Sequence, residues 1–115
     1  MRLLNIATAL ALLAVSPTAL AETAPAASGV GFTLKDHRFS PDAVILPAGR
    51  SVDVTLINQD NTIEEFDSDD LGVEETAHPG ETIHFKIGPL KPGAYDFMGE
   101  FHPVTAHGTV TATAG

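Results

Sequence analysis

Apolar and polar residues alternate along most of this chain beyond residue 29, with a period of two. Such alternation is typical of β-strands that bury one face, whereas an amphipathic helix repeats every 3.6 residues. The alternating segments are 30–34, 44–46, 52–56, 83–87, 95–97 and 109–113. Turns rich in Pro and Gly follow at 47–49, 78–80 and 91–93. About seven short strands with regular turns between them predict an all-β sandwich.

No segment beyond residue 21 shows a convincing helical stripe. Residues 67–75 could hold one helical turn, since Asp69 and Asp70 would suit its N-terminus. There is no internal repeat and no sign of a second domain. We therefore expect a single β domain.

The first 21 residues differ from the rest of the chain. Arg2 gives a positive start, residues 3–15 are apolar, and 19–21 (Ala-Leu-Ala) form a small-x-small cleavage signal. This pattern predicts a secretory signal peptide that is too short for a membrane anchor. Residues 22–29 are small and contain proline, which predicts a flexible tail before a domain at 30–115. We expect export to the periplasm and no membrane insertion after cleavage.

The chain is strongly acidic, with a formal net charge of −9 over its 115 residues. Removing residues 1–21 takes away only Arg2 among the charged groups, so the exported form carries about −10. Nucleic acids and anionic membranes are bound through clustered Lys and Arg, which are scarce here. The charge argues against both partners and suits a protein that works near cations, although solubility alone would also explain it.

The segment 95–102 (Tyr-Asp-Phe-Met-Gly-Glu-Phe-His) holds the strongest chemical signal. It places the thioether of Met98, the carboxylate of Glu100 and the imidazole of His102 in one loop between two predicted strands. This mixture of ligand types indicates a metal site. We expect Phe101 to anchor the loop in the core. The alternatives are a histidine bonded to the backbone and a methionine that fills the core.

Two further segments offer ligands. Glu64 and Glu65 form a carboxylate pair beside Phe66, and two neighbouring carboxylates raise each other's pKa unless a cation is present. Alternation places Glu64 on the same face as Phe66 and turns Glu65 the other way. His37 lies before Phe39 at the start of a predicted strand. A solvated acidic face and a surface histidine are the alternatives.

Several short sequence segments together resemble a known family, and the resemblance spans nearly all of residues 30–113. They are Phe39-Ser-Pro41, Leu46-Pro47-Ala48-Gly49, residues 52–58, and 92–97 continued through Gly108-Thr109-Val110. The chain resembles a cupredoxin on these residues. Residues 35–39, 64–68, 88–93 and 99–103 are similar, more narrowly, to cupredoxin-like proteins of bacterial ferrous-iron uptake systems. The resemblance implies a Greek-key β-sandwich with a metal site at one end, the end at which His37 begins its strand.

The chain departs from the electron-transfer cupredoxins at three of four ligand positions. By resemblance, the first histidine falls on Glu64, the cysteine on Gly99, the downstream histidine on His102 and the axial methionine on Ala106. Because the chain has no cysteine, it cannot build a blue-copper centre, which requires a thiolate.

We therefore predict a cupredoxin-like metal-binding protein that binds copper and/or iron. The predicted ligands are His37, Glu64, Glu65, Met98 and His102. Copper is expected in vitro because it binds such sites more tightly than ferrous iron does. The resemblance implies a role beside a periplasmic iron-binding protein and an inner-membrane iron permease. The alternatives are a small copper-dependent ferroxidase and an interaction module that binds no metal.

Overall fold

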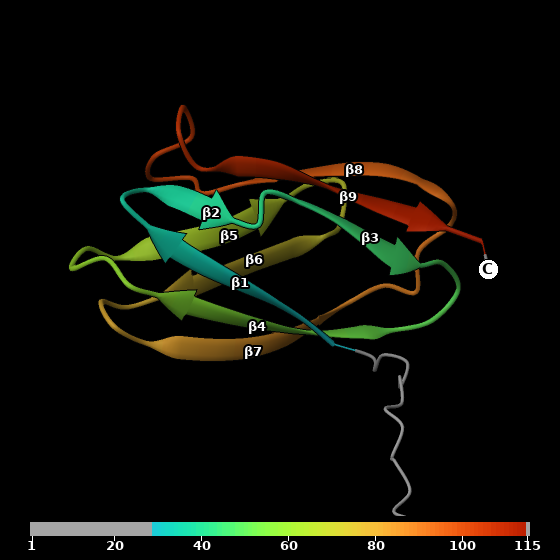
Figure 1. The fold of residues 1–115 in the computed structure, drawn as a ribbon, viewed down its shortest axis with the longest axis horizontal. Helices are drawn as coiled ribbons and strands as arrows, with labels where there is room; N and C mark the ends of the chain where they lie inside the picture. The colour runs from blue at the N-terminus through green and yellow to red at the C-terminus, as the bar shows by residue number, and fades with distance from the viewer. Residues whose placement is uncertain (1–28, 115) are drawn as a thin grey trace, which may run out of the picture.

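Residues 29–114 are described by the computed structural model and form two β-sheets packed face to face (Figure 1). The first sheet has the order β2-β1-β4-β7. Its strands are β1 (Gly29–Lys35), β2 (Arg38–Ser40), β4 (Val52–Asn58) and β7 (Thr82–Ile87). The predicted signal peptide and residues 22–28 of the predicted tail lie outside the described residues.

The second sheet has the order β3-β9-β8-β5-β6. Its strands are β3 (Ala43–Pro47), β5 (Glu64–Ser68), β6 (Val73–Ala77), β8 (Gly93–Met98) and β9 (His107–Thr113). Each sheet contains one parallel pair, β1 with β4 and β3 with β9. The remaining neighbours are antiparallel.

The all-β prediction is confirmed, with nine strands within residues 29–114 in place of about seven. The two extra strands lack a hydrophobic signal: β2 has three residues, and β6 contains the consecutive pair Glu74-Glu75. The helical turn considered for residues 67–75 is not formed. Residues 69–72 make the turn between β5 and β6, whose backbones pair from Glu64 with Ala77 to Ser68 with Val73. None of the described residues forms a helix of the length and hydropathy needed to span a membrane.

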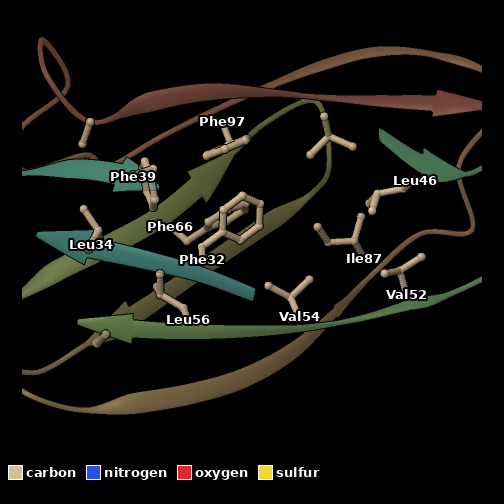
Figure 2. Close-up of a cluster of buried hydrophobic side chains, with 13 residues drawn as sticks. Phe32, Leu34, Phe39, Leu46, Val52, Val54, Leu56, Phe66, Ile87 and Phe97 are labelled. Atoms are coloured by element: carbon tan, nitrogen blue, oxygen red, sulfur yellow. The ribbon is translucent and has the colours of Figure 1, made fainter. Parts of the chain in front are cut away.

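Four phenylalanines from four strands fill the centre of the sandwich (Figure 2). Phe66 of β5 and Phe97 of β8 stack with centroids 4.6 Å apart. Phe32 of β1 and Phe39 of β2 meet Phe97 edge-on at 5.2 and 5.0 Å. Offset and edge-to-face pairs of this kind add about 0.5–1.5 kcal/mol each beyond simple burial. They couple the two sheets beneath one end of the molecule.

Three connections lie together at that end, on the left of Figure 1: the β1–β2 turn, the β4–β5 loop and the β8–β9 loop. The buried amide of Asn58 organises the middle one. Its Nδ2 donates to the carbonyls of Thr62, Ala77 and His78 at 2.9–3.1 Å, and its Oδ1 accepts from the Asp60 N–H at 2.9 Å. A buried polar side chain with this many partners holds the loop in one conformation.

Candidate metal centre

Three of the predicted ligands meet at this end of the sandwich. Nδ1 of His37 lies 2.8 Å from Oε2 of Glu64, and Nδ1 of His102 lies 3.1 Å from Oε1 of the same carboxylate. The two imidazole rings stack with centroids 3.6 Å apart and planes 18° apart. A carboxylate only accepts hydrogen bonds, so each ring donates to it from Nδ1. One carboxylate therefore orients both imidazoles.

Glu64 is held at the boundary between the core and the loops. It lies at the start of β5, two residues before Phe66 and on the same face, and it is fully buried. Besides the two imidazoles, the Thr62 hydroxyl donates to Oε2 at 2.9 Å. A buried carboxylate is costly unless such partners or a cation compensate it. The prediction that Glu64 turns inward is confirmed.

His37 is placed by a two-residue hairpin turn between β1 and β2. Lys35 pairs with Arg38, and both central residues have positive φ, 54° at Asp36 and 58° at His37. This combination defines a type I′ turn, in which Asn and Gly are the usual residues. The Asp60 carboxylate accepts both turn N–H groups, from Asp36 at 2.6 Å and from His37 at 3.0 Å. It thereby stabilises a backbone conformation that histidine rarely adopts.

Burial alone would raise the pKa of Asp60, but the hydrogen bonds from the His37 and Asp36 N–H groups outweigh it and hold the pKa below its usual value. The stability contributed by ionised Asp60 is therefore present above the unfolded-state pKa of about 3.9 and is lost as pH falls through the lower folded value.

We expect Asp60→Asn to destabilise the metal-free protein by about 1–3 kcal/mol at neutral pH. The side chain of asparagine has one acceptor oxygen, whereas the N–H groups of Asp36 and His37 each need one. The NH2 group of the asparagine would face one of these two donors. Urea denaturation at several pH values would measure the loss, which should shrink in acid as wild-type Asp60 becomes protonated. A loss that is the same at every pH would contradict this role of the Asp60 charge.

His102 is fixed by the backbone of the β8–β9 loop. Its N–H donates to the Gly99 carbonyl at 3.0 Å, its carbonyl accepts from the Ala106 N–H at 2.8 Å, and the Gly99 N–H donates to the Ala106 carbonyl at 2.9 Å. The expectation that Phe101 anchors the loop is wrong, because this side chain is 51% exposed. The buried methyl group of Ala106 and these backbone bonds hold the loop instead.

Gly99, at the position expected for a cysteine ligand, has no room for a larger side chain. Gly99 is packed so that a Cβ atom there would lie 3.0 Å from the Cβ of Ala106 and 3.2 Å from the Glu65 carbonyl oxygen. Ala106, at the position expected for the axial methionine, is itself fully buried. Two small residues thus fill the space where the resemblance places two sulfur ligands.

Glu65 and Met98 do not join the group of His37, Glu64 and His102. Glu65 points to the outer face of β5, as the alternation predicts, and contributes a carboxylate oxygen to a separate acidic group. Met98 follows the buried Phe97, is 43% exposed, and lines a surface hollow with His107 among others. Whether either binds a metal stays a prediction.

Glu65 is an unusual carboxylate because only 6% of it is exposed. Burial raises its pKa, and the nearby charges of Glu100, Asp67 and Glu74 raise it further, while a hydrogen bond with the Thr76 side chain opposes the rise.

Two residues of the β4–β5 loop that support the centre were missed in the sequence. Asp60 and Thr62 contact His37 and Glu64, but a loop Asp or Thr carries no periodic signal. Three other histidines lie elsewhere. His78 is hydrogen-bonded to Glu81 and His84 to Thr55, while His107 is the first residue of β9.

The donor set of this candidate centre fits a transition-metal ion. Imidazole binds Cu, Zn, Fe and Ni, and two histidines with one carboxylate recur at ferrous-iron sites. The N···O separations of 2.8 and 3.1 Å match the roughly 3 Å between neighbouring ligands that each bond a metal at about 2.0–2.2 Å. One ligand atom from each of the three side chains lies within 4.8 Å of the others. The side chains of His37 and His102 are 39% and 32% exposed, which leaves a path from solvent.

Comparison with known proteins supports the fold and the family. Residues 5–112 match the family model described as the cupredoxin-like domain. The chain is 43% identical over 81 residues to the uncharacterized protein RP394 of Rickettsia prowazekii (strain Madrid E). That match covers 70% of this chain and 65% of the other, so the chain spans just under two thirds of that relative's length.

Solved structures share the fold at low sequence identity. Auracyanin A, a blue copper protein of Chloroflexus aurantiacus, aligns with a TM-score of 0.65 at 12% identity, over 74% of this chain and 98% of that one. A Cu(I) form of an amicyanin mutant aligns with a TM-score of 0.59 at 17% identity, and the alignment covers 76% of this chain and 85% of that one. The metal-binding domain of the Cu(I)-exporting ATPase CopA of Streptococcus pneumoniae D39 aligns with a TM-score of 0.63 at 16% identity. This alignment covers 74% of this chain and 84% of that one.

Proposed function

Because this chain belongs to the cupredoxin-like domain family, we propose that it is a metal-binding protein that holds one transition-metal ion, copper and/or iron, between His37, Glu64 and His102. The observation that supports this most is the convergence of two imidazoles, brought by separate connections, on both oxygens of one fully buried carboxylate. A buried carboxylate with two neutral imidazoles provides the charge and donors that a divalent ion requires.

Copper and iron are favoured by different features of this centre. The general affinity order places Cu²⁺ above Fe²⁺ at almost any nitrogen and oxygen site, so we expect tighter copper binding in vitro. The two-histidine, one-carboxylate set is also one that ferrous iron uses. Met98, on the outer face, and Glu65 are not needed for this ion. The centre is a site without sulfur, unlike a blue-copper site.

We expect Cu²⁺ to raise the melting temperature of the purified protein by about 10 °C or more at a free concentration a hundred times the Kd, because the ion binds only the folded arrangement. Scanning calorimetry with Cu²⁺, and anaerobically with Fe²⁺, measures the shift against protein held in a chelator. A melting temperature that stays constant with both ions would favour the reading of the fold as an interaction module without metal.

We further propose that the protein is exported to the periplasm and assists iron uptake beside an iron-binding protein and an iron permease. The support is the predicted signal peptide and the phrases at residues 35–39, 64–68 and 99–103 that resemble such systems. Uptake of labelled ferrous iron should fall in cells that lack the protein and recover when it is restored. Unchanged uptake would contradict this role while leaving the metal centre untouched.

A further inference from the structure

A second group of potential ligands lies on the outer face of the five-stranded sheet. It consists of Glu65 and Asp67 of β5 and Glu100 of the β8–β9 loop, each of which offers one carboxylate oxygen within 4.8 Å of the others. Glu65 and Asp67 share this face because they are two residues apart in one strand. Three acidic groups this close repel one another unless a cation or a proton intervenes.

The Glu65 side chain adds an independent observation. It is 6% exposed, and its Oε1 atom is buried with no hydrogen-bond partner among the described residues. A buried acceptor without a partner costs about 1–3 kcal/mol, and folded proteins almost always satisfy such atoms. In the part of the chain that the structure describes, Glu65, Asp67 and Glu100 form no ion pair with Lys, Arg or His. A cation bound to this carboxylate would supply the missing partner.

A surface hollow leads to this acidic group. Asp67 and Glu100 line it together with Asp69 and Glu74, and no basic side chain is among its lining residues. The hollow admits water, which a small cation needs to complete its coordination. Its acidic lining concentrates cations near the group.

We propose that Glu65, Asp67 and Glu100 form a second metal site, specific for a hard divalent cation bound through oxygen alone. Three carboxylates with water ligands are the donor set that Mn²⁺, Mg²⁺ and Ca²⁺ prefer, in contrast to the imidazole-rich set at Glu64. The two sites lie on opposite faces of β5, because Glu64 and Glu65 are consecutive residues of one strand. The second site is independent of the proposed function of the first.

The test uses Mn²⁺ as the probe, with binding measured by calorimetry and by the loss of the free-ion paramagnetic resonance signal. The purified protein should bind one Mn²⁺ at this group. Glu65→Gln should weaken that binding by about tenfold or more, since loss of even an outer partner of a metal ligand costs 10–100-fold. The His37→Ala/His102→Ala variant should bind Mn²⁺ as the parent does, which separates this site from the histidine centre.

Glu74→Gln is the matched control, because it removes one carboxylate that lines the hollow and leaves the three proposed ligands in place. It should change the Mn²⁺ affinity by less than about threefold, the size of a screened surface effect. Equal losses for Glu65→Gln and Glu74→Gln would mean a diffuse acidic surface and would overturn the proposal, as would an absence of Mn²⁺ binding. Glu100→Gln, at an exposed loop position, replaces Glu65→Gln if the latter does not fold.

Discussion

Replacing His37 and His102 together with alanine is expected to weaken Cu²⁺ binding by about a hundredfold or more, because both nitrogen donors of the centre are lost. Glu64 would remain as the single protein ligand of the three, with only the Thr62 hydroxyl still bonded to it. Calorimetric titration of the folded variant, at a temperature well below its melting point, measures this effect.

The matched control removes two histidines that lie away from the centre. His78 is hydrogen-bonded to Glu81 and His84 to Thr55. Neither is among the side chains hydrogen-bonded to Glu64, which are His37, Thr62 and His102. His78→Ala/His84→Ala should therefore leave the copper affinity within about threefold of the parent. If both double variants lost affinity equally, copper would be bound by scattered surface imidazoles and the centre at Glu64 would be wrong.

The His37→Ala/His102→Ala variant should also lose stability in the absence of metal. Removing the partners of a buried charge costs about 3–5 kcal/mol, because the charge stays buried without compensation. Adding Glu64→Gln to the two alanines should recover part of that loss without restoring copper binding. This pattern separates a defect in folding from a defect in metal binding.

The second large effect is expected at Gly108, the second residue of β9. A Cβ atom at this position would clash with the backbone carbonyl oxygen of Asp42 and approach the Cζ of Phe97 to 2.5 Å. That Asp42 carbonyl accepts the Thr109 N–H at 2.9 Å, so a shift would break the junction between β3 and β9. We expect Gly108→Ala to lower the free energy of unfolding by about 3 kcal/mol, at the upper end of overpacking effects. Denaturant unfolding measures it.

Gly31→Ala in β1 is the control for this substitution. A Cβ atom there would lie 4.0 Å from the Thr55 carbonyl oxygen, an ordinary contact distance, and the backbone has no positive φ. The unfolding free energy of this variant should stay within about 0.5 kcal/mol of the parent. A similar loss at both glycines would show that strand glycines are costly to replace in general and that the Phe97 contact is not the cause.

Much of the fold could be predicted because the core strands alternate cleanly. β4 buries Val52, Val54, Leu56 and Asn58 on one face, and a period of two is the direct mark of a half-buried strand. β6 lacks this alternation of apolar and polar residues, since its place at the sheet edge lets Glu74 and Glu75 remain at the surface. Its existence depends on pairing with β5, which is a tertiary effect.

The three residues of the centre were among the predicted ligands, and for Glu64 alternation also predicted the direction of the side chain. The spacing of two residues from Phe66 predicts that Glu64 points inward, and the structure has it buried there. The same rule, applied to the buried Phe97, turns the adjacent Met98 outward. The contribution of Asp60 depends on hydrogen bonds to residues 23 and 24 positions away, which no local pattern encodes.

Pulsed paramagnetic resonance on the protein loaded with one Cu²⁺ tests the histidine centre most directly. The spectrum should show couplings to the nitrogens of two imidazoles, one lost in His37→Ala and the other in His102→Ala, without the intense blue absorption of a copper–thiolate bond. Imidazole couplings that survive both substitutions, or a spectrum without any, would contradict a metal centre built on His37, Glu64 and His102.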